Sequence, residues 1–139
     1  MGFHREIRWP ALAYVDRRRL AQSNVGVHEM NTRGLVPVMN NTKWEELRLA
    51  MYSLGDIHPK WRTKGVETGF IPEWDGEWFY HFRNGGYDPI EWVQIKVTSP
   101  MQDLAVLRAL KSIHVPGENT EHGYRVFGYA EPGKAVDYF

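Results

Sequence analysis

The residues best suited to chemistry lie in an acidic, histidine-containing stretch near the middle of the chain. Asp75, Glu77 and His81 are close in sequence there, and Asp88 and Glu91 follow shortly after them. A carboxylate beside an imidazole can raise the pKa of the histidine and orient it as a general base, or help it to bind a metal ion. The catalytic hypothesis is therefore a small hydrolase or metal-dependent enzyme that uses His81 with Asp75 or Asp88.

The spacing of these residues argues against a single catalytic centre. If residues 77–82 form a strand, Glu77 and His81 share a face but lie about 13 Å apart, at roughly 3.3 Å per residue. A phosphate-binding glycine loop, a His-Glu-x-x-His helix and a Gly-x-Ser-x-Gly elbow are all missing from the sequence. The chain also has no Cys, which excludes thiolate nucleophiles, disulfides and cysteine metal sites. Solvated carboxylates and a surface histidine are the simpler interpretation, and we expect neither a metal nor a cofactor.

Aromatic residues are the more informative feature, at 14% of the chain with six Trp. Many of them fall in one stretch: Phe70, Trp74, Trp78, Phe79, Tyr80, Phe82, Tyr87 and Trp92. Rigid aromatic side chains are common anchors of protein interfaces, although they also fill small cores. We predict that Trp74, Trp78, Tyr80 and Trp92 are binding residues. The alternative is that these rings pack in the core or lie beneath a terminal segment.

Two helices are expected to position these aromatic residues. The first follows Thr42, which with Glu45 has the spacing of a capping box, and Gly55 is placed to end it. The second begins at Ser99-Pro100, with a serine cap and proline in the first turn, and stops before Pro116-Gly117. Apolar residues recur at helical spacing in both segments: Trp44, Leu47, Ala50, Met51 and Leu54 in the first, and Leu104, Leu107 and Leu110 in the second.

Four strands are expected beside the helices, because β-branched and aromatic residues dominate four short segments. These segments are residues 61–66, 77–82, 91–97 and 124–129. Asp75-Gly76 and Asn84-Gly85-Gly86 are turn signals that favour antiparallel pairing of neighbouring strands. The expected fold is α+β, a two-layer sandwich of a four-stranded antiparallel sheet and two helices, in the order α-β-β-β-α-β.

The N-terminal part of the chain differs in charge from the rest. Residues 1–38 carry six Arg against three acidic residues, whereas the remaining residues have eleven basic and fourteen acidic side chains. A length of 139 residues suits one domain. We therefore expect a basic extension over residues 1–38, which need not be ordered, and a single α+β domain over residues 39–139, with Met39 as an alternative natural start. Arg17, Arg18 and Arg19 could bind nucleic acid, but only weakly, because three cations neutralise few phosphates.

Several segments in the second part of the chain resemble a known family. They are Asn40-Asn41-Thr42-Lys43-Trp44-Glu45-Glu46-Leu47, Trp74-Asp75-Gly76-Glu77-Trp78, Glu91-Trp92 and Ile113-His114-Val115-Pro116-Gly117. Together they resemble a family of small bacterial proteins that is a domain of unknown function, over about residues 39–139. The resemblance implies an origin in bacteria or their phages. It implies no activity, cofactor or catalytic residue.

These observations lead to one main hypothesis and two alternatives. The main hypothesis is a non-enzymatic bacterial protein-binding module, with an immunity-type inhibitor of a toxin as its leading form. The alternatives are the enzyme that uses His81 and a homo-oligomeric structural protein that self-associates through an aromatic sheet face. No apolar run approaches the roughly 20 residues that cross a bilayer. We therefore expect a cytoplasmic protein whose partner is another protein, or a second copy of itself, rather than a membrane.

Overall fold

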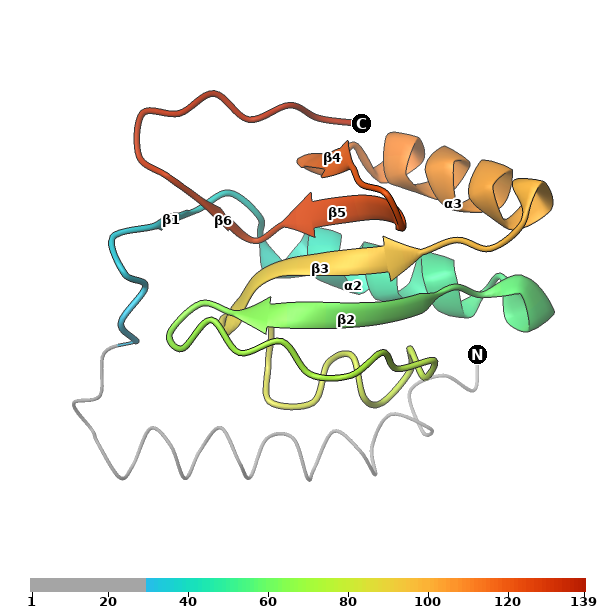
Figure 1. Cartoon of the computed structure of the whole chain (residues 1–139), viewed down its shortest axis with the longest axis horizontal. Coiled ribbons are helices and arrows are strands. Elements are labelled where there is room, and N and C mark those ends of the chain that lie inside the picture. The colour runs from blue at the N-terminus through green and yellow to red at the C-terminus, as the bar shows by residue number, and fades with distance from the viewer. Residues whose placement is uncertain (1–29) are drawn as a thin grey trace.

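The computed structural model describes residues 30–139 of the chain (Figure 1). In chain order its elements are β1 (Val36–Pro37), α2 (Asn41–Tyr52), the 3₁₀ helix η1 (Gly55–Ile57), β2 (Lys60–Gly65), β3 (Ile90–Lys96), α3 (Pro100–Ile113), β4 (Gly117–Asn119), β5 (Gly123–Phe127) and β6 (Tyr129–Ala130). The fold is α+β, as the sequence predicted.

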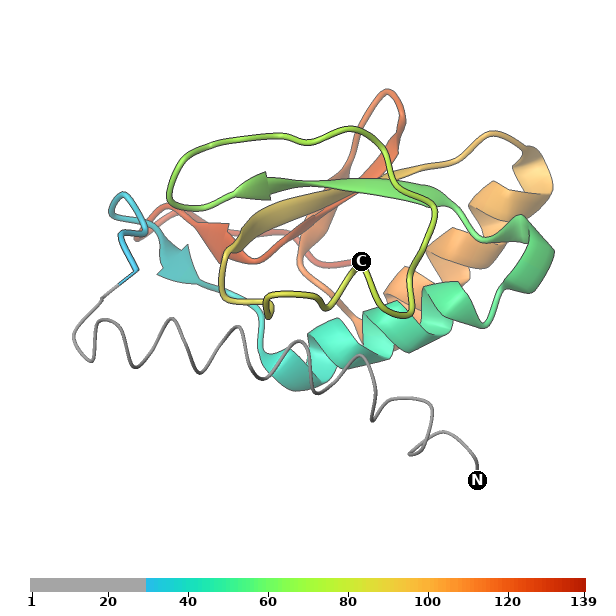
Figure 2. The same ribbon diagram turned by 90° about the horizontal axis from the view of Figure 1, so that it is seen from below.

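A four-stranded antiparallel sheet with the strand order β2-β3-β5-β4 organises the domain. Helices α2 and α3 lie on the same side of this sheet (Figures 1 and 2). The core forms between them and one sheet face, and its fully buried members include Leu47, Met51, Val93, Ile95, Val106, Leu110 and Val126. We call the sheet face turned away from the helices the outer face.

Helix α2 begins at Asn41, two residues earlier than a cap at Thr42 would place its start. Asn40, rather than Thr42, is the N-cap, and its side chain accepts a hydrogen bond of 2.8 Å from the Lys43 N–H. Trp44, Leu47 and Met51 are buried, as their spacing predicted. Arg48 lies outside this apolar spacing but is also fully buried. Its burial is possible because Glu45 of the same helix and the distant Phe79 carbonyl accept its hydrogen bonds.

Helix α3 has the predicted start but a different buried face. The Ser99 side chain accepts a hydrogen bond from the Gln102 N–H, and Pro100 occupies the first turn. Gln102, Val106 and Leu110 are buried, whereas Leu104 and Met101 are exposed. The leucine repeat was therefore a poor guide to this helix, because its buried stripe is rotated toward Val106.

The strands differ from expectation at one central point. Strands β2, β3 and β5 correspond to three of the predicted segments, but residues 77–82 form successive turns and not a strand. The fourth strand of the sheet is instead β4, in a segment that reads as a polar loop. The predicted order of elements was therefore wrong. The aromatic residues of 77–82 suit a strand locally, but tertiary contacts override that preference.

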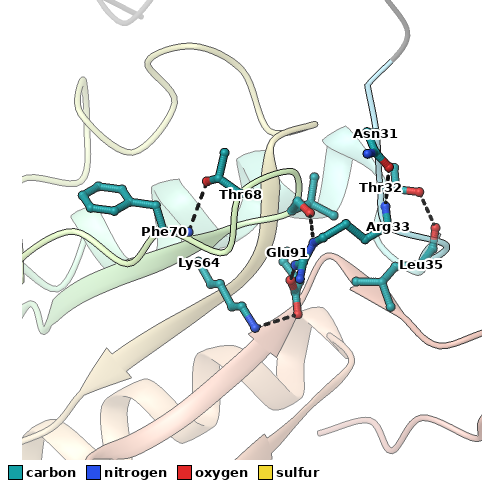
Figure 3. Close-up of polar contacts among 9 residues, drawn as sticks. Asn31, Thr32, Arg33, Leu35, Lys64, Thr68, Phe70 and Glu91 are labelled. Atoms are coloured by element: carbon teal, nitrogen blue, oxygen red, sulfur yellow. Dashed lines mark hydrogen bonds and ion pairs between the residues drawn. The ribbon is translucent and has the colours of Figure 1, made fainter.

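Residues 30–38 are part of the folded domain, so the expected boundary at Met39 does not separate an extension from the core structure. β1 pairs with β6. Arg33 donates a 2.6 Å hydrogen bond to the Val66 carbonyl and forms an ion pair with Glu91 (Figure 3). Lys64 lies 3.6 Å from the same carboxylate. Arg17, Arg18 and Arg19 lie outside the described residues.

The buried Arg48 joins α2 to the long segment between β2 and β3. Its guanidinium donates hydrogen bonds to the Glu45 carboxylate at 2.9 Å and to the Phe79 carbonyl at 2.6 Å. The same guanidinium lies 4.7 Å from the centroid of the Phe79 ring. Tyr87 also donates to Glu45. Burial alone would raise the pKa of Glu45, but hydrogen bonds from Arg48 and Tyr87, with the charges of Arg48 and Arg83, hold it below its usual value. The cluster is therefore organised around an ionised Glu45.

We expect Trp78→Ala to lower the free energy of unfolding by about 3–5 kcal/mol, because the mutation leaves a cavity in the aromatic core. Trp78 is 1% exposed and donates a 2.8 Å hydrogen bond to the Pro59 carbonyl. Tyr52→Ala, which truncates an aromatic side chain that is 51% exposed, is the matched control with a smaller expected loss. Denaturant unfolding measures both, and equal losses would contradict the buried role of Trp78.

The Glu45 cluster predicts a pH-dependent contribution to stability. Because the folded-state pKa of Glu45 is lowered, its contribution is present above the unfolded pKa and is lost as the pH falls through the folded value. Glu45→Gln should be less stable than the wild type at pH 7, and the difference should shrink at acidic pH. Urea unfolding between about pH 7 and pH 3 measures this, with the exposed Glu46→Gln as the control. A difference that stays constant with pH would refute the role of the Glu45 charge.

Candidate binding surface

The most unusual feature of the fold is the connection between β2 and β3, residues 66–89. The two strands are antiparallel neighbours, so a hairpin loop of two to five residues would join them, yet roughly 24 residues do so. Figure 2 shows this connection passing along β2 on the side away from the helices and then returning on the helix side. Long ordered loops of this kind commonly carry function on a rigid scaffold.

Aromatic side chains anchor the connection in the core. Trp78 and Phe82 are buried with ring centroids 4.8 Å apart, and both pack against Trp61 of β2, at 5.7 and 5.0 Å. Further along, Tyr87 is buried and stacks on Trp44 of α2 at 5.8 Å. Trp78 and Phe82 are four residues apart, a spacing that brings side chains together in a helical turn but not along a strand.

Polar contacts fix the turn that carries these anchors. The Glu77 carboxylate accepts hydrogen bonds from the backbone N–H groups of Phe79, Tyr80 and His81, at 3.1, 2.9 and 2.7 Å. The Asp75 carboxylate accepts a 2.8 Å hydrogen bond from the Glu77 N–H. The Asp75 backbone forms an isolated antiparallel β-bridge with Trp61 of β2. The side chain of Glu77 thus acts as a cap that holds residues 77–81 in a turn.

The outward side of the connection presents apolar residues to solvent. Phe70 is 68% exposed, and Ile71 and Tyr80 are each 42% exposed. A hollow of about 290 Å³ lies between the two limbs of the connection, and Phe70, Pro72 and His81 are among its lining residues. We call Phe70, Ile71 and Tyr80, together with this hollow, the loop surface.

The loop surface lies in the most acidic part of the described chain. The connection has five carboxylates and a single Arg, and the carboxylates are Glu67, Glu73, Asp75, Glu77 and Asp88. Two of them have internal roles, since Glu77 caps the turn and Asp75 contacts His81. The connection therefore carries an excess of four negative charges, with five carboxylates against one Arg, which favours a basic ligand surface.

The structure separates the four predicted binding residues. Tyr80 is exposed, and Trp74 is half-buried on the outer face of the sheet, where the Arg62 guanidinium lies 4.3 Å from its ring centroid. Trp78 is buried in the core, and Trp92 is 8% exposed beneath the guanidinium of Arg125. The choice of Trp78 and Trp92 as surface contacts was wrong, because the turn at Glu77 and the cover of Arg125 remove both rings from solvent.

The catalytic candidates are brought together in part. His81 Nδ1 lies 2.9 Å from an Asp75 carboxylate oxygen, so the pair has the contact that orients a histidine as a general base. Asp88 does not join them in the described contacts; its backbone carbonyl accepts a hydrogen bond from Tyr129. Within residues 30–139 no group of three or more His, Asp or Glu side chains is placed to hold a metal ion.

Sequence reasoning placed Phe70 in the aromatic stretch but did not select it, and it did not consider Ile71. The available signal was Pro72, because a proline following two apolar residues is unsuited to a central strand and favours an exposed loop. The role of Glu77 was also missed. A side chain that caps its own turn was not distinguishable from one on a strand, since residues 77–82 have high strand propensity.

The fold and this surface define a small α+β domain with a long, ordered and acidic connection between two strands. The chain belongs to the family described as "Family of unknown function (DUF6678)", whose model matches residues 27–133. This match confirms the resemblance to a domain of unknown function. The matched region begins at residue 27, upstream of the expected start at Met39. No curated protein and no solved structure matches the chain. None of the helices within residues 30–139 is long and apolar enough to cross a membrane.

Glu77→Ala should loosen the loop surface without unfolding the domain. It leaves three backbone N–H groups without their carboxylate partner, and loss of a comparable helix cap costs about 0.5–2 kcal/mol. We expect faster amide hydrogen exchange at Phe79, Tyr80 and His81, measured by NMR or mass spectrometry. Glu73→Ala, an exposed carboxylate of the same connection, is the control. Unchanged exchange in Glu77→Ala would show that the cap does not hold the turn.

Proposed function

We propose that this protein is a non-enzymatic binding module that recognises a basic partner protein through the loop surface. The observation that carries the proposal is the connection itself, which is far longer than its two strands require and displays Phe70 at its exposed side. A binding function accounts for both features. A connection with only a structural role would not need an exposed phenylalanine.

Preorganisation supports the proposal. Trp78, Phe82 and the Glu77 cap fix the backbone from which Tyr80 projects. The backbone of Phe70 is held separately, because its carbonyl accepts a 2.9 Å hydrogen bond from the Gly65 N–H and its N–H donates to the Thr68 side chain at 3.2 Å. A surface that is ordered before binding loses little conformational entropy when a partner docks, so more of the contact energy appears as affinity. Large apolar side chains next to a hollow are the usual centre of such interfaces, because a partner side chain can fill the hollow as the exposed rings are covered.

The negative charge of the connection indicates a partner with a basic surface. Five carboxylates against one Arg steer a basic surface toward Phe70 and raise the rate of association, most strongly at low salt. An immunity-type inhibitor of a basic toxin in a bacterium is the specific form of this proposal. The proposal includes a cytoplasmic location. The family to which the chain belongs has no assigned function, so these details rest on the surface alone.

The test is affinity capture from the native host followed by quantitative binding of the captured protein. We expect a partner with a basic surface whose dissociation constant rises at least about tenfold in Phe70→Ala/Tyr80→Ala, because two anchors are removed. The constant should also rise with salt. Met101→Ala/Leu104→Ala is the matched control, since Met101 has the same 68% exposure as Phe70 but lies on α3.

The control variant should bind as the wild type does, and all variants should show similar thermal unfolding. If the captured partner binds Phe70→Ala/Tyr80→Ala and the wild type equally well, the loop surface is not the interface. If binding is lost only in Met101→Ala/Leu104→Ala, the interface lies on α3. An acidic partner that needs Phe70 would contradict the charge argument while leaving the contact surface in place.

A further inference from the structure

A second surface, independent of the loop surface, lies on the outer face of the sheet. Lys60 and Arg62 of β2 and Lys96 of β3 share this face, because Lys60 pairs directly with Lys96 and Arg62 is two residues along the same strand from Lys60. Trp74 packs among them, with Arg62 at 4.3 Å and Lys96 at 5.4 Å from its ring centroid. These four residues form what we call the cationic face.

The cationic face is unfavourable for the isolated domain. Like charges directly opposite each other on neighbouring strands are destabilising, and Lys60 and Lys96 are such a pair. Within residues 30–139 none of Lys60, Arg62 and Lys96 forms an ion pair with a carboxylate. The stability of the fold therefore does not explain why these three cations are gathered here.

Two other cations on the same face have carboxylate partners, unlike Lys60, Arg62 and Lys96. Lys64 lies 3.6 Å from Glu91, which it shares with Arg33, and Arg125 lies 2.9 Å from Glu118. Among residues 30–139 the hydrogen-bond partner of Arg62 is neutral, the side-chain carbonyl of Gln94 at 2.8 Å. Among the sheet cations in the described part of the chain, those without a carboxylate partner thus lie at the end of the sheet where Trp74 is.

The Trp74 ring among the cations indicates which class of anionic ligand suits this face. Nucleic-acid bases stack on tryptophan rings and on guanidinium planes, while lysines neutralise the phosphates between them. The layer made by Arg62 on Trp74 offers a stacking platform, and Lys60 and Lys96 lie beside it. An acidic protein surface would use the cations but would gain little from the ring.

From these contacts we propose that the cationic face binds single-stranded nucleic acid. The phosphates contact Lys60, Arg62 and Lys96, and a base stacks at Trp74. The molecule as a whole has zero formal net charge, so this is a local site and not a consequence of overall charge. It is separate from the proposed loop surface, whose charge has the opposite sign.

The test is fluorescence anisotropy of the full chain with labelled 20-nucleotide oligo(dT) and oligo(U), starting from about 50 mM salt, where phosphate contacts are strong. Lys60→Ala/Arg62→Ala/Lys96→Ala should weaken binding at least tenfold. It should also reduce the slope of log affinity against log salt by about 2, at roughly 0.7 per phosphate contact. Trp74→Ala should weaken binding while leaving that slope nearly unchanged, because stacking releases no counterions. The oligo(dT) and oligo(U) arms show whether DNA or RNA is preferred.

Two charge controls and one surface control accompany these variants. Arg108→Ala/Lys111→Ala removes two exposed cations from α3, and Phe70→Ala/Tyr80→Ala removes the loop surface; both should bind the oligonucleotides normally. Arg17→Ala/Arg18→Ala/Arg19→Ala tests the arginine run near the N-terminus. The proposal is overturned if the wild type shows no saturable binding, or if the triple variant of the cationic face binds normally. Loss of binding only in the Arg17–Arg19 variant, or an unaltered affinity of Trp74→Ala together with equal competition by polyglutamate, would also overturn it.

Discussion

The packing of Trp78 and Phe82 against Trp61 is the interaction on which the rest of the structure depends. Trp61 belongs to β2, whereas the other two rings belong to the connection that follows it. By burying these rings on the helix side, the domain fixes a long segment that would otherwise lose too much backbone entropy to stay ordered. Glu77, Asp75 and Arg48 then satisfy the backbone groups of that segment.

The same anchoring separates two surfaces of opposite charge. Before the turn, Trp74 crosses to the outer face and lies among the cations of β2 and β3. Within the turn, Trp78 enters the core, and Tyr80 faces solvent in an acidic setting. A formal net charge of zero therefore hides a charge separation, and whole-chain charge is a poor guide to the partners of this domain.

Local signals were sufficient where the residues act within one element. Ser99 and Pro100 identified the start of α3, because capping depends on neighbours in sequence. The β-branched and aromatic runs identified β2 and β3. The cap of α2 was displaced from Thr42 to Asn40, since both residues can accept the required hydrogen bond and only the path of the chain before the helix decides between them.

The sequence by itself determined the α+β class, two helices, three of the four strands of the sheet, and an unusual concentration of aromatic residues. Only the tertiary structure decided which aromatic residues are buried, because burial depends on a turn capped by Glu77 in a segment whose local preference is for a strand. It also decided that Arg48 is internal, since its partner carbonyl at Phe79 is distant in sequence. The pairing of Lys60 with Lys96 likewise follows from strand register, which residues on two separate strands cannot specify alone.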